Sequence, residues 1–225
     1  MIIAVDGPAA SGKSSTAKTL ARRLGFRHLE SGAFYRTLTL AALRAGIPVE
    51  DWEALSVDEL DGLAVSARPV AGGFALQIDG EDVGEAIRSA EVNAHVSRMA
   101  AIPAVREWLL DRLRDAARGV NTVTDGRDMG TVVFPEADLK IFLVADPETR
   151  ARRRLAENGN PDPDRDELIA ETRRLKERDR LDSERRTAPL RRADDAVTVD
   201  TTALTFDEQV DMIEVLARAH ARAAG

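Results

Sequence analysis

The sequence predicts an α/β fold in which a mostly parallel sheet is covered by helices on both faces. Short apolar segments alternate with amphipathic helical stretches along the 225 residues. A glycine-rich loop joins the first strand to the first helix, and helix-capping residues mark later boundaries. Alternation of this kind is typical of strands linked by crossover helices, which run parallel in one sheet.

Capping residues fix two of the expected helix starts. Asp146-Pro147 predicts a helix start, because aspartate caps a helix and proline fits its first turn. Thr205 and Glu208 form a capping box for the last helix. The expected elements are, in order, a strand over 2–5, a helix over 14–24, a strand over 26–30, a helix near 33–45, a helix over about 103–119, strands over 120–124 and 139–145, a helix from 147, a charged helix near 165–185, a strand over 196–200 and a C-terminal helix.

Two segments interrupt this alternation. Gly72-Gly73 and Asp79-Gly80 separate short β-like runs, which predicts a small antiparallel hairpin unit, and a helix over 88–102 follows. The polar segment 157–164 cannot sustain a helix, so it is a connector or a mobile lid. We therefore expect a core of residues 1–62 and 103–225, an insertion of residues 63–102, and a short lid loop of residues 155–166.

The loop after the first strand carries the strongest functional motif. Residues 7–14 read Gly-Pro-Ala-Ala-Ser-Gly-Lys-Ser, which matches G-x-x-x-x-G-K-[ST] between a strand and a helix. In such a P-loop, backbone N–H groups and the helix N-terminus surround phosphate oxygens. Lys13 adds a charge for the β- and γ-phosphates, and the Ser14 hydroxyl can ligate Mg²⁺. The residues predicted to bind a nucleoside triphosphate are Gly7, Pro8, Ala9, Ala10, Ser11, Gly12, Lys13, Ser14 and Ser15.

Composition narrows the class of protein. With 44% hydrophobic and 32% charged residues the chain can build a core under a charged surface, and its net charge of −7 disfavours nonspecific nucleic-acid binding. No segment reaches the ~20 apolar residues that cross a bilayer, and nothing resembles a signal peptide. The absence of cysteine excludes disulfides and thiolate catalysis. We expect a cytoplasmic, monomeric enzyme with no membrane or nucleic-acid partner.

Further phosphate-binding residue types stand where predicted strands end. Ser31 and Arg36 follow the second strand, and Asp125 and Arg127 follow the strand over 120–124. The carboxyl edge of a parallel sheet is where α/β proteins bind ligands. Asp125 can bind Mg²⁺ through a water molecule, and Arg127 can bind the phosphate of an acceptor. This second set of residues predicts a second, phosphorylated substrate.

Two arginine-rich helices extend this set. Arg150 and Arg153 lie on one helix face ahead of the polar loop, and Arg178, Asp182 and Arg185 recur at i, i+4 and i+7 further on. Charged faces of this kind are often only solvated. The N-K-x-D motif of GTPases is missing, because no asparagine is followed by lysine, and the transporter ATPase motif L-S-G-G-Q is missing too.

The chain resembles the bacterial cytidylate (CMP) kinases, in the nucleoside monophosphate kinase branch of the P-loop proteins. The matching segments are GPAASGKS at 7–14, SGAFYR at 31–36, VREWLL at 105–110, DGRDMGTVVFP at 125–135 and the R-D-x-x-D-S-x-R run at 178–185. The 125–135 block is highly specific, whereas the phosphate loop alone is not. In this family an insertion after the second helix binds the acceptor, so the resemblance gives that role to residues 63–102. Glu30 stands where aspartate is expected, which keeps the charge.

The resemblance also implies roles for individual residues. Ser31, Arg36 and Arg127 would hold the CMP phosphate, with Tyr35 lining that pocket. The residues implied at the cytosine edge and at the sugar are Ser97, Arg106, Asp128 and Arg185 for the base, and Arg178 and Asp182 for the pentose.

The expected reaction is transfer of a phosphoryl group from ATP to CMP or dCMP, with Mg²⁺ at Ser14 and Asp125. Such transfer depends on positioning and charge neutralisation. The residues expected to carry catalysis are Lys13, Arg127, Arg150, Arg153 and Asp125. Two alternatives stay open: a kinase of the same fold acting on another nucleoside monophosphate or a small metabolite, and a non-catalytic nucleotide switch or RNA-binding regulator. The insertion and the 125–135 block disfavour a kinase with another acceptor. The arginines at the ends of the predicted strands disfavour a non-catalytic switch or regulator.

Overall fold

The computed structural model describes residues 1–223, which divide into two compact units. Within them, unit 1 comprises Met1–Leu24 and the chain from Val123 onward, and unit 2 comprises Gly25–Thr122. Unit 2 therefore contains the expected insertion, 63–102, together with flanking segments that we had expected in the core. The narrower boundaries of an acceptor-binding insertion stay a prediction.

Unit 1 is built on parallel strands, as the alternation of segments predicted. The strands are β1 (Ile2–Asp6), β6 (Thr122–Gly126), β7 (Leu139–Val144) and β8 (Val197–Asp200), and they follow one another in the sheet in the order β6-β1-β7-β8. β1 pairs with β7 in parallel, with Val5 beside Ile141, and β7 pairs in parallel with β8. The carboxyl ends of β1 and β7 thus share one edge, where the glycine loop begins.

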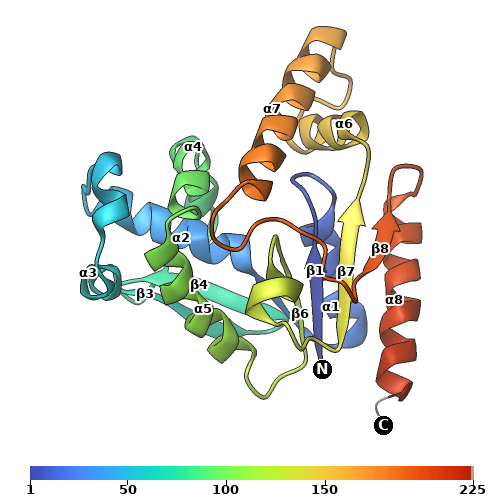
Figure 1. Ribbon diagram of the computed structural model, residues 1–225, viewed down its shortest axis with the longest axis horizontal. Helices are drawn as coiled ribbons and strands as arrows, with labels where there is room; N and C mark the ends of the chain where they lie inside the picture. The colour runs from blue at the N-terminus through green and yellow to red at the C-terminus, as the bar shows by residue number, and fades with distance from the viewer. Residues whose placement is uncertain (224–225) are drawn as a thin grey trace. The chain divides into compact units, whose positions relative to one another are not determined.

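The helices of unit 1 are α1 (Lys13–Leu24), α6 (Pro147–Glu157), α7 (Arg165–Ser183) and α8 (Phe206–Ala223). α1 packs against α8, and α6 packs against α7 beyond the carboxyl ends of the strands (Figure 1). The predicted caps are confirmed: Asp146 accepts the amides of Glu148 and Thr149, both at 3.0 Å, and the Thr205–Glu208 box is formed. α7 ends at Ser183, so Arg185 lies beyond the helix on which we expected it.

Unit 2 contains the predicted hairpin. Its elements are β2 (Arg27–Glu30), α2 (Ser31–Arg44), β3 (Val65–Val70), β4 (Gly73–Ile78), β5 (Glu81–Asp82), α4 (Ala90–Met99) and α5 (Pro103–Ala117). β3, β4 and β5 form an antiparallel sheet, and Gly72 adopts φ +75° in the turn that pairs Val70 with Gly73. The carbonyl of Gly72 accepts the His28 amide at 3.0 Å, which ties the hairpin to β2.

Four short helical elements were not predicted. They are the 3₁₀ helices η1 (Val49–Ala54) and η2 (Gly84–Arg88), the helix α3 (Val57–Gly62) and the π-helical turn η3 (Met129–Val133). Short helices carry too few turns for a periodic pattern. The capping box of Ser56 and Glu59 could have revealed α3. The helix expected over 88–102 is confirmed as α4, which is shorter and is capped by Ser89.

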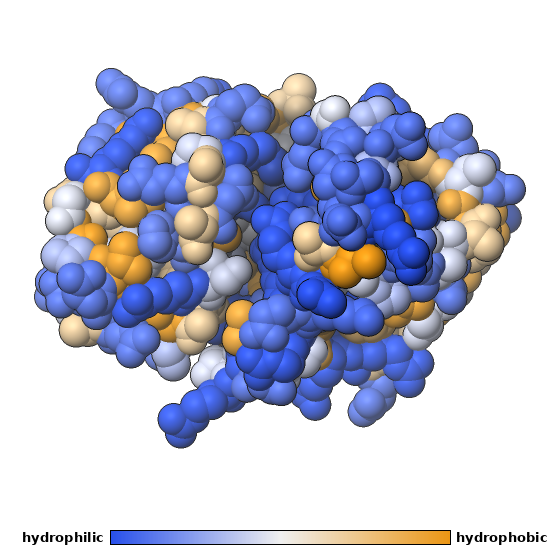
Figure 2. All heavy atoms as spheres, turned by 90° about the horizontal axis from the view of Figure 1, so that it is seen from above, coloured by the Kyte–Doolittle hydropathy of each residue, from blue (hydrophilic) through white to orange (hydrophobic). Residues whose placement is uncertain are grey.

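The face shown in Figure 2 is mostly hydrophilic, with hydrophobic residues scattered over it. The large apolar side chains that are exposed in the described part of the chain are Val57, Ile169, Leu181, Phe206, Met212 and Val215. Between residues 1 and 223 no helix has the length and apolar character to span a bilayer.

Trp52 anchors η1 in the core of unit 2. Its side chain is fully buried, its indole N–H donates to the Ile47 carbonyl at 3.1 Å, and its ring meets that of His95 edge-on at 5.9 Å. Trp52 is therefore a packing residue of unit 2.

We expect Trp52→Ala to lower the free energy of unfolding by about 3–5 kcal/mol, because it leaves a large cavity in a closed site. Trp52→Phe keeps most of the volume and should cost less. Urea denaturation of both variants measures the difference. A Trp52→Ala protein within ~1 kcal/mol of the wild type would show that η1 does not depend on this side chain.

Candidate functional site

The loop between β1 and α1 adopts a conformation that requires its glycines. A Cβ on Gly7 would lie 2.3 Å from the Leu143 carbonyl oxygen, and Gly12 has φ +84°. Ala10 also adopts a positive φ, +56°, which is strained for a residue with a side chain. The Ser11 hydroxyl is buried with no hydrogen-bond partner among the described residues. Strain and an unsatisfied buried donor at one loop are typical of a preorganised binding site.

A hydroxyl and a carboxylate stand side by side where the motif predicts a metal. The Ser14 hydroxyl donates to Asp125 Oδ2 at 2.5 Å, so a residue of α1 meets a residue of β6. No group of three or more His, Cys, Asp or Glu that could hold a metal occurs in residues 1–223. Few protein ligands suit Mg²⁺, which usually keeps waters and binds substrate phosphates. A hydroxyl and a carboxylate suit such a site, and magnesium binding by Ser14 and Asp125 stays a prediction.

Lys13 is buried among charged groups of both signs. Its Nζ donates to the Pro8 carbonyl at 3.0 Å, and its side chain is buried. Burial and the positive charge of Arg127 lower the pKa of Lys13 to about 7, with a further contribution from Arg178, against the opposing effect of Asp125. An anion bound here would stabilise the charged form of Lys13.

Asp182 contacts two arginines near Lys13. Its Oδ2 accepts from Arg127 Nε at 2.7 Å, and its Oδ1 lies 3.9 Å from an Nη atom of Arg185. Burial alone would raise the pKa of Asp182, but Arg127, with Arg185 and Arg178, outweighs it and holds that pKa below its usual range. Unit 1 thus brings together Arg127, Arg178, Asp182 and Arg185, which were predicted from separate parts of the sequence.

Asp6 fixes the turn that follows Arg127. Its two carboxylate oxygens accept the amides of Met129 at 2.9 Å and Gly130 at 2.7 Å. Burial raises the pKa of Asp6 to about 6, although these two hydrogen bonds lower it. Asp128, predicted at the base, is buried immediately before this turn. The turn directly after Arg127 and Asp128 is therefore held from the strand that leads into the phosphate loop.

Arg150 and Arg153 make different contacts although they share one face of α6. Arg150 is buried and donates to Asp179 Oδ2 at 2.6 Å and to the Ala9 carbonyl at 2.9 Å. Arg153 donates to the hydroxyl and the carbonyl of Thr201, at 2.9 and 2.6 Å. A catalytic role for these two arginines at a transferred phosphate stays a prediction.

The remaining predicted residues belong to unit 2. Arg36 Nη1 donates to Asn93 Oδ1 at 2.7 Å, which joins α2 to α4. Arg106 is buried, donates to the Ala100 carbonyl at 3.0 Å, and places its guanidinium 5.5 Å from the centre of the Tyr35 ring. Ser31 and Ser97 also lie in unit 2. Ser31 is buried at the start of α2, and Ser97 is exposed on α4.

Sequence reasoning missed four polar residues that contact the predicted ones or the segments beside them. They are Asp6, Asp179 and Thr201 in unit 1 and Asn93 in unit 2. Asp6 precedes the glycine loop directly and Asp179 lies inside the 178–185 run, so position alone could have drawn attention to both. No feature of the sequence distinguishes Asn93.

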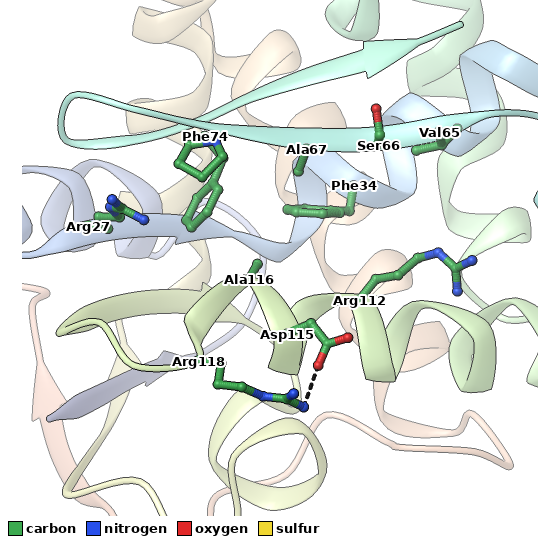
Figure 3. Close-up of a pocket in the computed structure, with 11 residues that line it drawn as sticks. Arg27, Phe34, Val65, Ser66, Ala67, Phe74, Arg112, Asp115, Ala116 and Arg118 are labelled. Atoms are coloured by element: carbon green, nitrogen blue, oxygen red, sulfur yellow. Dashed lines mark hydrogen bonds and ion pairs between the residues drawn. The ribbon is translucent and has the colours of Figure 1, made fainter. Parts of the chain in front are cut away.

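A separate cavity of about 490 Å³ lies in unit 2 between the β3–β4 hairpin and α5 (Figure 3). Phe34 and Phe74 form much of its apolar wall. Two of its arginines have acidic partners, since Arg118 pairs with Asp115 at 2.6 Å and Arg112 with Asp61 at 2.5 Å. None of the predicted site residues lines this cavity.

These observations define the class of protein as a P-loop kinase with an α/β fold. The chain is similar in fold to a gluconokinase from Sinorhizobium meliloti 1021, with a TM-score of 0.51 at 17% identity over 99% of this chain and 94% of that one.

Sequence comparison identifies the family within this class. The family model for cytidylate kinase matches residues 3–219. The chain is 45% identical to a cytidylate kinase of Chlorobaculum tepidum over 95% of its own length and 91% of the relative's, and 45% identical to one of Mycobacterium avium over 100% and 98%. The chain belongs to the cytidylate kinase family.

The buried Asp6 predicts a measurable pH dependence of stability. Because its pKa rises from the ordinary 3.8 to about 6, the folded state binds a proton more tightly than the unfolded state. The contribution of Asp6 to stability is therefore lost as the pH rises from about 4 to 6, by up to ~3 kcal/mol.

Asp6→Asn removes this titration. The free energy of unfolding of the wild type minus that of Asp6→Asn should therefore fall as the pH rises through this interval. Urea unfolding at several pH values measures the difference, and a pH-independent difference would contradict the raised pKa.

Proposed function

We propose that this protein transfers the γ-phosphoryl group of ATP to CMP and dCMP, in a reaction that requires Mg²⁺. The observation that carries the proposal is the cationic site of unit 1, where Lys13 is buried beside Arg127 and Arg178. Three cations beside a phosphate loop suit a reaction in which the donor and the acceptor both carry phosphate groups. The names of the relatives support the choice of acceptor.

The donor would bind through the phosphate loop. Backbone N–H groups of the loop and the N-terminus of α1 would surround its phosphates, while Lys13 would neutralise charge on the transferred group. Ser14 and Asp125 would hold Mg²⁺, which when bound neutralises phosphate charge. The side chains of this protein would thus position the two substrates and neutralise their phosphate charge. The nucleophile would be the phosphate oxygen of the acceptor itself.

The family resemblance supports a role in acceptor binding for a larger set of residues. Arg127, Ser31 and Arg36 would bind its phosphate, and Arg178 and Asp182 its sugar. The residues proposed at the base are Ser97, Arg106, Asp128 and Arg185, with Tyr35 lining the pocket. The buried positions of Arg106 and Asp128 support this role, because buried polar groups discriminate strongly between matched and mismatched partners.

We expect kcat/KM for CMP to exceed that for UMP by about 30-fold or more, since uracil reverses the donor and acceptor pattern at two ring positions and leaves buried groups unpaired. An ADP-release assay with CMP, dCMP, UMP, AMP and GMP measures this. Values for CMP and UMP within threefold would contradict the cytosine pocket. Turnover of another acceptor alone would favour a kinase with a different substrate.

We expect Lys13→Ala to lower kcat by about 100-fold or more, because a charge contact made in the transition state is lost. Lys18→Ala is the matched control, since Lys18 is exposed on the same helix and should keep its turnover. Near-normal turnover of a folded Lys13→Ala enzyme would contradict the assignment of the phosphate loop.

A further inference from the structure

Asp179 and Arg150 together hold one residue of the phosphate loop. Asp179 Oδ1 accepts the Ala9 amide at 3.1 Å, and Asp179 Oδ2 accepts from Arg150 Nη1 at 2.6 Å. The same Arg150 atom donates to the Ala9 carbonyl at 2.9 Å, which closes a three-membered network. Both side chains are largely shielded, with 5% of Arg150 and 19% of Asp179 exposed. A shielded, charge-assisted network orients its members more firmly than an exposed pair.

The network reaches Lys13 through a single peptide group. The peptide between Pro8 and Ala9 donates its N–H to Asp179 and accepts at its carbonyl from Lys13 Nζ, at 3.0 Å. Because a peptide group is planar, fixing its N–H direction also fixes the direction of its carbonyl. The orientation of the Lys13 partner is therefore set by a carboxylate on α7.

Apolar packing reinforces the same junction. Ala9 is buried in a cluster with Ala151 of α6 and Leu168 and Leu175 of α7, and Ala10 packs against it. Ala10 holds the strained φ of +56° directly after the clamped residue. A strained conformation persists only where the surroundings enforce it, and here both polar and apolar contacts from α6 and α7 do so.

Two carboxylates one turn apart on α7 therefore serve different parts of the site. Asp179 contacts the phosphate loop and Arg150, whereas Asp182 contacts Arg127 and Arg185. The contact with the loop lies on the donor side, and the contact with Arg127 lies on the proposed acceptor side.

We propose that Asp179, oriented by Arg150, is a positioning residue for the phosphate donor, and that it acts through the Pro8–Ala9 peptide on Lys13. The inference rests on the proposed function in so far as the donor is ATP. Because Asp179 binds the backbone of the phosphate loop, its loss should weaken donor binding and turnover while it leaves acceptor binding nearly unchanged.

The test compares carboxylate-to-amide variants of one helix. Asp179→Asn should raise the KM for ATP, and the Kd for Mg-ATP measured calorimetrically without acceptor, by about tenfold, with the KM for CMP within threefold. Asp182→Asn should show the reverse split. Glu177→Gln is the matched control, because Glu177 pairs with Arg180 on the exposed side of α7 and should leave all constants unchanged.

A double-mutant cycle tests whether Asp179 and Arg150 act as one unit. Asp179→Ala and Arg150→Ala should each raise the Kd for Mg-ATP, and the double variant should be no worse than the poorer single variant. Circular dichroism monitors folding. Should the alanine variants not fold, Arg150→Lys keeps the charge but not the forked donors, and it should raise the same Kd.

The outcomes separate the inference from the proposed function. A wild type that binds no ATP would overturn both. A wild type that binds ATP, with Asp179→Asn binding it within twofold, would overturn the positioning role alone. Equal increases in the KM values for ATP and CMP would also overturn it, because a general loss of structure would then explain the effect.

Discussion

The burial of Lys13 among other charged groups at the phosphate loop is the constraint on which the rest of unit 1 depends. Lys13 lies near the cations Arg127 and Arg178 and near the carboxylates Asp125 and Asp182. Burial, together with Arg127 and Arg178, lowers the pKa of Lys13 to about 7. A bound polyphosphate would favour the charged form of Lys13, which is how binding energy can be directed to the reacting group.

Carboxylates hold the main chain around Lys13 in place, because they accept hydrogen bonds from backbone amides as well as from side chains. Asp6 holds the turn after Arg127 through two amides, and Asp179 holds the loop before Lys13 through another. Both fix the direction of a main-chain segment that carries a functional side chain. Groups held in this way need little rearrangement when charge develops during phosphoryl transfer. The raised pKa of Asp6 shows that this order has a cost in stability.

Unit 2 orients its predicted acceptor residues by a different means. Arg36 is turned toward Asn93 of α4, and Arg106 lies over the Tyr35 ring while it binds the Ala100 carbonyl. These contacts join α2, α4 and α5, so a change in the packing of one helix would move several of the proposed acceptor residues together. The role of these residues in acceptor binding stays a proposal.

The sequence by itself determined the parallel α/β class, the glycine loop, the hairpin turns and the capped starts of α6 and α8, because periodicity, capping and turn chemistry act over a few residues. It also pointed to Lys13, Ser14 and Asp125, whose residue types and positions at strand ends carry their chemistry. Only the tertiary structure decided the partners of Ala9 and Asp6, since Asp179 is 170 residues from Ala9 and Met129 is 123 from Asp6. The short η1 and η3 and the placement of Arg185 beyond α7 were likewise decided by packing. Contacts between distant segments depend on how the strands and helices assemble, and no local pattern encodes them.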